Sequence, residues 1–359
     1  MNEWPTKLKS LILSEFATVH DAMAAIDLGA QQIALVVDGD GRLRATVTDG
    51  DIRRALLRGV GLDAPVSQVM HSAFTAVTQD MGREAALILM QARGLHHVPI
   101  VDTDGRLVDL AVVDDKLGVV RRDTRVILMA GGLGTRLRPL TETVPKPMLP
   151  VGGKPILELI LRKFIEQGFH DFTIALNYKG EMIRDHFSDG SRFNARIDYV
   201  EETKQMGTAG ALSLLETRPD GPFIVMNGDL LTTVSFDLLE RFHRECGAVG
   251  TMCARNYPIQ VPYGVIEMEG AELRRIVEKP TYSHFVNAGI YVLSPEALDH
   301  MVAGEFLDMP TLFERIMAVN HKAAVFPIEE YWIDIGRPDD LDRARTEHSE
   351  MFSADEDGE

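Results

Sequence analysis

A glycine-rich turn follows an apolar run near residue 130 and is the strongest chemical feature of the sequence. Residues 126–130 read Val-Ile-Leu-Met-Ala, and Gly131, Gly132 and Gly134 follow directly. Glycines let the backbone approach a ligand closely and adopt positive φ, and successive N–H groups in such a turn form a concave anion site. A Rossmann fingerprint requires a glycine where Leu137 stands, and a Walker loop requires Gly-Lys-Ser/Thr. The turn therefore predicts a phosphate-binding loop of another type.

Two positively charged residues lie in and shortly after this turn in the sequence. Arg136 belongs to the turn itself, and Lys146 stands between Pro145 and Pro147. Proline restricts the backbone at low entropic cost, so the position of Lys146 is well defined. We expect both cations to reach the same phosphate-sized cavity.

The turn and both cations lie in one string, GGLGTRLRPLTETVPKPMLPVGGKP. This string resembles the sugar-phosphate nucleotidyltransferases, and the resemblance covers about residues 125–345. It implies a Rossmann-like, doubly wound α/β domain with a mixed sheet. It also implies that Arg136 and Lys146 bind a nucleoside triphosphate, together with Met129, Ala130, Gly131, Gly132, Gly134 and Thr135.

Two aspartates are the candidate metal ligands. Asp229 follows the apolar run 223–226, which predicts a buried strand, and ligands of open α/β sheets bind at the carboxyl ends of such strands. The resemblance assigns Asp229 and Asp334 to a metal ion. Mg²⁺ is usually held by one or two carboxylates and the substrate phosphates, so we expect Mg²⁺ as the cofactor.

By the same resemblance, Glu201, Glu202, Gly207 and Thr208 belong to the segment that binds the nucleobase. Uridylyl- and thymidylyltransferases of the family tend to carry glutamine near this position. A carboxylate only accepts hydrogen bonds, and guanine offers two adjacent donors, N1–H and the 2-amino group. Glu201 or Glu202 therefore favours GTP, and Glu202 is the more informative of the two. The alternative is that both glutamates face solvent at a strand end.

Further segments resemble those that line the sugar pocket of this family. They contain Gly264, Glu278, Lys279 and Asn287. Lys279 suits the phosphate of the sugar, Glu278 and Asn287 can bind sugar hydroxyls, and Gly264 permits close approach of the backbone.

The implied reaction is an in-line attack by a phosphate oxygen of a sugar 1-phosphate on the α-phosphorus of the nucleotide, with loss of pyrophosphate. The nucleophile is already anionic near neutral pH, so no general base is expected. Positioning and electrostatics carry such a transfer. The resemblance gives this work to Arg136, Lys146, Asp229 and Lys279.

The first third of the chain contains an internal repeat. Residues 38–43 read DGDGRL and return at 102–107 as DTDGRL, an offset of 102 − 38 = 64 residues. Each copy lies between two apolar runs, which predicts a hairpin, and follows a helical pattern, at 19–28 and at 83–94. Two helix–hairpin units resemble a cystathionine β-synthase (CBS) domain pair, an α+β module that commonly binds adenine nucleotides.

In CBS pairs a Ser/Thr-x-x-Asp element holds the ribose of the nucleotide. The first copy carries it as Thr48 and Asp51, whereas the second copy has no hydroxyl at the first position of residues 112–115. We therefore expect at most one well-formed regulatory nucleotide site. The alternative is that the pair only packs and mediates dimerisation.

A CBS pair ahead of a short nucleotidyltransferase resembles bacterial enzymes that make GDP-sugars for surface glycans. This resemblance favours glucosamine 1-phosphate as the acceptor, and mannose and heptose 1-phosphates are alternatives that the residues do not separate. A different class of protein, a catalytically silent nucleotide sensor, would be expected to lose a cation or a metal ligand. Arg136, Lys146, Asp229 and Asp334 are all present.

We expect a CBS pair at 1–122, with copies at about 5–60 and 65–120, a nucleotidyltransferase domain at 123–348 and an acidic tail at 349–359. The boundary lies in the charged segment before the apolar strand that begins at Arg125.

A net charge of −17 argues against a nucleic-acid partner, because duplex binding requires a basic face. No apolar run approaches the ~18 residues that span a bilayer, and the amino terminus carries no evident signal peptide. Cys246 and Cys253 lack the spacing of metal ligands. These features favour a cytoplasmic protein without a membrane partner. We also expect a homo-oligomer.

Overall fold

A computed structural model describes residues 4, 6–29, 31–82, 85–86, 89–90, 95–112 and 121–352. The chain forms two compact units, Met1–Gly118 and Val119–Glu359, each of which is considered by itself. The second copy of the Ser/Thr-x-x-Asp element, the linker before residue 121 and most of the acidic tail lie outside the described residues.

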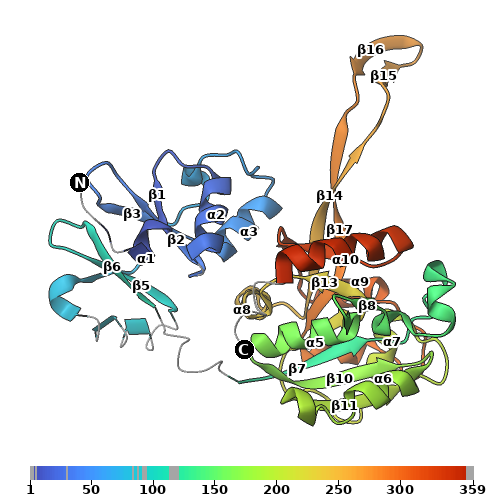
Figure 1. Cartoon of the computed structure of the whole chain (residues 1–359). Helices are drawn as coiled ribbons and strands as arrows, with labels where there is room; N and C mark the ends of the chain where they lie inside the picture. The colour runs from blue at the N-terminus through green and yellow to red at the C-terminus, as the bar shows by residue number, and fades with distance from the viewer. Residues whose placement is uncertain are drawn as a thin grey trace. The chain divides into compact units, whose positions relative to one another are not determined.

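The first unit contains two small three-stranded sheets, with strand orders β1-β2-β3 and β4-β5-β6 (Figure 1). Its strands are β1 Ile12–Ser14, β2 Ile33–Val37, β3 Leu43–Thr48, β4 Val77–Thr78, β5 His97–Val101 and β6 Leu107–Val112. Its helices are α1 Thr6–Lys9, α2 Val19–Gly29 and α3 Asp49–Leu57, with 3₁₀ turns at Val66–Gln68 and Gln79–Met81. The helix expected at 19–28 is confirmed, and the one expected at 83–94 falls largely outside the described residues.

The two expected hairpins are confirmed, since β2 pairs with β3 and β5 with β6, both antiparallel. Their turns are nearly identical: Asp38 accepts hydrogen bonds from the backbone N–H of Asp40 and Arg42, and Asp102 accepts the equivalent pair. The turns also bond to each other, Leu43 N–H to Gly105 O and Leu107 N–H to Gly41 O, at 3.0 Å each. The repeat thus packs its two copies turn against turn.

The second unit is built on a seven-stranded sheet of order β11-β10-β7-β12-β17-β14-β18. The first four strands of this order are parallel to one another, whereas β17 is antiparallel to both β12 and β14. The sheet is therefore mixed, as expected. Its strands are β7 Arg122–Met129, β10 Phe169–Leu176, β11 Arg196–Glu201, β12 Phe223–Asn227, β14 Gly250–Gln260, β17 Thr281–Leu293 and β18 Ala323–Ile328.

Helices cover both faces of this sheet (Figure 1). Along β7, Val126 and Leu128 face one hydrophobic core while Ile127 faces the other, as the period of two in a strand requires. The helices are α5 Ile156–Glu166, α6 Gly180–Phe187, α7 Gly207–Gly210, α8 Phe236–Cys246, α9 Met309–Ala318 and α10 Pro338–Phe352. Short pairs complete the unit: β8 Pro150–Val151 with β9 Lys154–Pro155, β13 Leu230–Thr232 with β19 Trp332–Asp334, and β15 Val265–Glu269 with β16 Glu272–Val277.

One part of the second unit leaves its body. Beyond Arg255, β14 loses its neighbour β18 and pairs with β17 alone, and β15 and β16 continue this two-stranded ribbon to its tip. We call residues 256–285 the arm; it projects from the sheet as a long hairpin (Figure 1). In the residues that the structure describes, no helix is long and apolar enough to cross a membrane.

Candidate nucleotide-binding site

The glycine loop begins where β7 ends, at the carboxyl end of the central parallel strands. Gly134 has φ +61°, and a Cβ there would lie 2.9 Å from Cγ2 of Thr141 and 3.1 Å from Cβ of Lys146. Thr141 donates its hydroxyl to Gly134 O at 2.8 Å. Gly134 thus allows the loop to close onto the segment that carries Lys146, and a larger residue would force the two apart.

Lys146 lies between the two candidate metal ligands. It forms an ion pair with Asp229, and its Nζ is 3.8 Å from Oδ1 of Asp334. The lysine side chain is 8% exposed. Asp229 follows β12, and Asp334 ends β19, which pairs with β13 so that Leu230 faces Asp334. Burial and the negative charge of Asp229 raise the pKa of Asp334.

The two aspartates suit Mg²⁺ better than a metal that requires a protein cage. No group of three or more His, Cys, Asp or Glu side chains is placed to hold a metal in the described ranges. Oδ1 of Asp229 is buried and has no hydrogen-bond partner there, and Oδ1 of Asn227 is in the same state. Oxygen atoms left free beside a second carboxylate match a cation that completes its shell with substrate phosphates.

Arg136 lies on the outer side of this cluster and is exposed. Its Nη1 is 3.6 Å from the position that a Cβ on Gly336 would take, and its charge lowers the pKa of Asp334. Arg136 therefore faces Asp334, whereas Lys146 faces the cavity described next.

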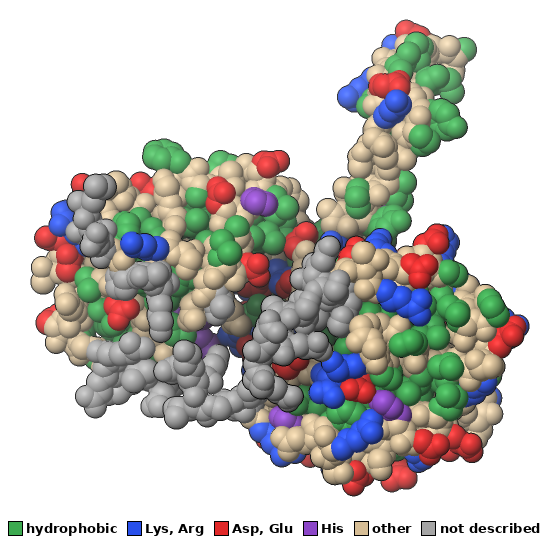
Figure 2. Space-filling model, in the orientation of Figure 1, with side chains coloured by type: hydrophobic (Ala, Val, Ile, Leu, Met, Phe, Trp, Pro, Cys, Tyr) green, Lys and Arg blue, Asp and Glu red, His purple; other side chains and the backbone are tan. Residues whose placement is uncertain are grey.

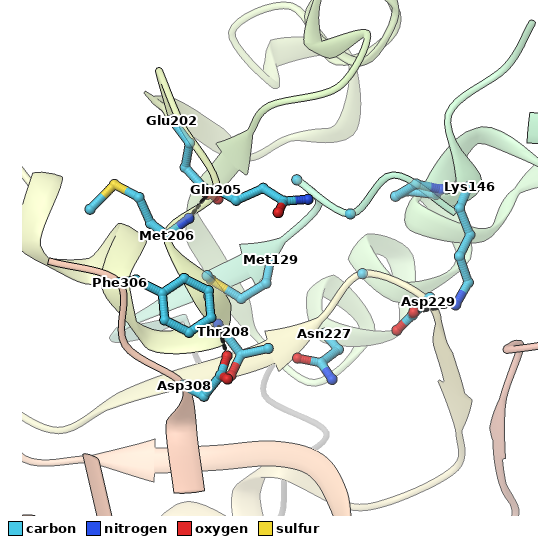
Figure 3. Close-up of a pocket in the computed structure, with 15 residues that line it drawn as sticks. Met129, Lys146, Glu202, Gln205, Met206, Thr208, Asn227, Asp229, Phe306 and Asp308 are labelled. Atoms are coloured by element: carbon cyan, nitrogen blue, oxygen red, sulfur yellow. Dashed lines mark hydrogen bonds and ion pairs between the residues drawn. The ribbon is translucent and has the colours of Figure 1, made fainter. Parts of the chain in front are cut away.

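A cavity of about 340 Å³ opens beside the loop (Figure 3). The residues that line it are Met129, Gly131, Gly132, Lys146, Pro147, Glu202, Gln205, Met206, Gly207, Thr208, Asn227, Gly228, Asp229, Phe306 and Asp308. Most of the residues expected to bind the nucleotide are among them. Ala130, Gly134, Thr135 and Arg136 are not among the residues that line the cavity.

Of the two glutamates left open by the sequence, Glu202 lines the cavity. Its Oε2 accepts a hydrogen bond from Met206 N–H at 3.1 Å, and its Oε1 is 2.7 Å from the position of a Cβ on Gly131. Burial raises the pKa of Glu202. The Glu201 side chain is 71% exposed and lies 3.7 Å from Arg184, outside the cavity.

The wall opposite the loop joins two distant segments. Gly207 has φ +80°, and a Cβ there would lie 2.5 Å from Leu307 O. Thr208 N–H donates to Asp308 at 3.1 Å, and its hydroxyl accepts from Met309 N–H at 2.8 Å. Sequence analysis missed this second segment. Phe306, 57% exposed at the cavity, offers an aromatic face on which a base can stack.

The four residues expected to bind the sugar do not line this cavity. Gly264, Glu278 and Lys279 lie on the arm and are exposed. Asn287 lies below the arm, where its amide is used by the fold: Nδ2 donates to the Tyr291 hydroxyl and Oδ1 accepts from Gly289 N–H.

In the first unit, Thr48 and Asp51 form a capping box at the start of α3. Oδ2 of Asp51 accepts from Thr48 N–H at 2.9 Å and from the Thr48 hydroxyl at 2.6 Å, and Oδ1 accepts from Arg54. The pair that sequence analysis singled out is therefore preorganised by its own hydrogen bonds.

A mixed, doubly wound sheet with a glycine loop, a buried lysine and two aspartates at its carboxyl edge defines a nucleotide-binding α/β protein. The family model described as nucleotidyl transferase matches residues 125–350, so the chain belongs to that family. CBS domain models match residues 5–58 and 66–115.

Similar proteins act on different nucleotides. The mannose-1-phosphate guanyltransferase of Kluyveromyces lactis is 34% identical over 229 residues, which are 60% of this chain and 62% of that protein. The UTP–glucose-1-phosphate uridylyltransferase of Synechocystis is 31% identical over 236 residues, 60% of this chain and 61% of that protein. This chain thus spans less than two thirds of the length of these relatives.

Among solved structures, a glucose-1-phosphate thymidylyltransferase from Bacillus anthracis shares the fold. Its TM-score is 0.52 at 20% identity, over 62% of this chain and 94% of that one.

Proposed function

We propose that this chain transfers a guanylyl group from GTP to a sugar 1-phosphate, giving a GDP-sugar and pyrophosphate. The observation that carries the proposal is the position of Lys146, buried at the cavity between Asp229 and Asp334. A cation and two carboxylates at the end of a glycine loop suit a polyphosphate that arrives with Mg²⁺.

The chain contributes by binding and orienting charged groups. Gly131 and Gly132 line the cavity, where their backbone N–H groups would bind phosphate oxygens, while Lys146 neutralises negative charge as pyrophosphate departs. Asp229 and Asp334 would hold Mg²⁺, which when bound supplies Lewis-acid stabilisation of the same charge. Because the attacking oxygen belongs to an anionic phosphate, no residue is required as a general base.

Glu202 supports guanine as the base. It is the carboxylate that lines the cavity beside Met206 and Gly131, and hydrogen bonds from Met206 N–H and from the Asn177 side chain hold it there. The acceptor favoured by the domain arrangement is glucosamine 1-phosphate, and the relative from Kluyveromyces lactis supports mannose 1-phosphate as the alternative. Pyrophosphate release that requires GTP, Mg²⁺ and a sugar 1-phosphate together tests the proposal, and GTP binding without release would instead indicate a nucleotide sensor.

Replacing Asp334 with asparagine should weaken Mg²⁺ binding by about tenfold or more, since loss of even an outer-shell partner commonly costs that much. The measurement is the Mg²⁺ concentration that gives half of the metal-dependent rise in melting temperature with GTP bound. Asp339→Asn, an exposed aspartate in the first turn of α10, is the control and should behave as wild type. Equal Mg²⁺ dependence in all three proteins would contradict the metal assignment.

We further propose that an adenine nucleotide binds the CBS pair beside Thr48 and Asp51. Isothermal titration calorimetry with AMP, ADP and ATP should detect binding to wild type and a large loss in Asp51→Ala. Asp21→Ala is the matched control, because Asp21 makes the same pair of bonds with Thr18 before α2, so that its loss removes an equal cap. Absence of heat with all three nucleotides would contradict this site.

A further inference from the structure

In each of its two ladders the arm has an apolar face that the described residues of its own chain leave exposed. In the register of β14 and β17, Ile259 pairs with Tyr282, and Tyr257 lies two residues from Ile259 on the same face. Nearer the tip, Ile266 pairs with Ile276 and Met268 with Leu273. These side chains are 46–69% exposed. Green side chains are visible along the arm in Figure 2.

The amount of apolar surface is larger than a monomer ordinarily leaves in water. Nine large apolar side chains of the arm are exposed: Tyr257, Ile259, Tyr263, Ile266, Met268, Leu273, Ile276, Tyr282 and Phe285. Seven of them are the side chains named above, since Phe285 lies on the opposite face and Tyr263 outside the strands. At roughly 100 Å² each these seven amount to about 700 Å² per chain, whereas the largest patch of a typical monomer is about 300–600 Å². Two such arms would bury about 1,400 Å², which lies within the size range of standard stable interfaces. A two-stranded hairpin alone is also only marginally stable in water.

The arm springs from the edge of the nucleotide cavity. β17 passes the cavity at Gly289, where a Cβ would lie 2.7 Å from Nδ2 of the lining residue Asn227. Lys279 lies 10 residues before Gly289 along the ribbon (289 − 279 = 10). At ~3.3 Å per residue, this separation is about 30 Å. Within one chain, Lys279 is therefore far beyond the reach of the cavity.

The root of the arm has no hinge that would fold it back. Five successive pairs, from Asn256↔Phe285 to Gln260↔Thr281, continue the ladder of the sheet, and its irregularity lies below them, between Met252 and Ala254. Bending the arm onto its own domain would break this ladder.

The cavity lacks a second cation. Of the described residues that line it, Lys146 alone is positively charged, and it is paired with Asp229. Glu202 and Asp308 add negative charge. A sugar phosphate that enters beside a triphosphate requires a further cation, and Lys279 with Glu278 is carried outward on the arm.

We propose that two copies of this chain exchange arms, so that the apolar face of each arm packs on the other copy's domain of residues 121–352. Glu278 and Lys279 of one copy then reach the nucleotide cavity of the other and complete its sugar-phosphate site. The assignment of Lys279 to the sugar phosphate rests on the proposed function, whereas the packing of the arm does not.

The packing is tested by photo-cross-linking of the full-length protein. A photoreactive amino acid replaces Ile276 on the apolar face, or Arg275, its neighbour on the opposite face, as the matched control. The expected product is a two-chain band from position 276, much stronger than from position 275, with the attachment point mapped by mass spectrometry to residues 121–352 of the other copy. Cross-links within one chain, or to residues 4–112, would overturn the proposal, as would a monomer in light scattering.

The shared site is tested by mixing two inactive variants, Lys146→Ala and Lys279→Ala. Co-expressed with different tags and purified as a heterodimer, they should recover about half of the wild-type activity per chain, because one of the two symmetric sites joins an intact cavity to an intact arm. If each arm served its own chain, the heterodimer would stay inactive, and the shared site would be overturned. A wild-type protein without any activity would instead refute the proposed function, and the cross-links would then decide the exchange alone.

Discussion

Replacing Lys146 with alanine lowers kcat for pyrophosphate release by about 10²–10³-fold or more, the cost of removing one preorganised group that stabilises transition-state charge. The loss is expected in kcat because Lys146 is buried beside Asp229 and acts where the leaving pyrophosphate develops charge. Single-turnover measurement with GTP, Mg²⁺ and a sugar 1-phosphate reads this step directly. Arg136→Ala is expected to abolish turnover as well, because Arg136 adds positive charge on the Asp334 side of the cluster.

Lys146→Ala also removes the cation that lies between the carboxylates of Asp229 and Asp334. We expect the free energy of unfolding to fall by about 1–3 kcal/mol, less than for a fully buried pair because the Asp334 side chain is 47% exposed. Lys163→Ala is the control, since Lys163 makes only a surface ion pair with Glu166 at 3.3 Å. Denaturant unfolding separates this loss of stability from the loss of catalysis. A folded Lys146→Ala protein with near-normal pyrophosphate release would refute the assignment.

Replacing Glu202 with glutamine reduces kcat/KM for GTP by about 10–100-fold, because a hydrogen bond to a charged group contributes about 1.5–3 kcal/mol. Glutamine presents a donor as well as an acceptor, so UTP should improve relative to GTP. Glu201→Gln is the matched control: its side chain is 71% exposed beside Arg184 and should leave the preference unchanged. A preference that shifts with Glu201 and not with Glu202 would contradict this account of base recognition.

The same glutamate predicts a pH dependence. Burial raises the pKa of Glu202 above the ordinary value of 4.5, so its carboxylate is protonated at a higher pH than that of an exposed glutamate. The acceptor form binds guanine, and the affinity for GTP should therefore fall as the pH is lowered towards that raised pKa. Binding measured by fluorescence of a GTP analogue should show this decrease in wild type and not in Glu202→Gln. Parallel curves for both proteins would contradict it.

The loop and Asp229 could be placed from the sequence because each closely follows an apolar strand. Lys146 lies in the 3₁₀ turn Lys146–Met148 and was placed by its resemblance to the family instead. β7 and β12 are parallel neighbours, and their pairing ends at Asn227↔Met129, so the residues that follow both strands meet at one edge. The positive φ of Gly134 could be predicted because the residue belongs to this loop. Its closeness to Thr141 could not be predicted from the sequence.

Phe306 and Asp308 could not be predicted from any local pattern. They reach the cavity because Leu307 O accepts hydrogen bonds from the N–H groups of Ala209 and Gly210, and Thr208 binds Asp308 across 100 residues of sequence. Such long-range pairing depends on how α9 packs on the sheet, which hydrophobic periodicity does not encode.

The arm illustrates the same limit. Similarity to the family predicts Glu278 and Lys279 at a sugar pocket, but the sequence analysis did not predict the long hairpin that carries them. The direction of the hairpin depends on the register of β14 with β17 beyond the end of β18. That register is a property of the assembled sheet. The proposed exchange of arms would bring Glu278 and Lys279 to the cavity of the other copy.

Pyrophosphate release measured for ATP, CTP, GTP and UTP against glucosamine, mannose and heptose 1-phosphates, with Mg²⁺ present, tests the central claim most directly. Turnover with GTP and one of these sugar phosphates, no turnover without Mg²⁺, and a GDP-sugar as the product are the predicted result. Binding of GTP without pyrophosphate release in every combination, or equal turnover with UTP, would contradict the account.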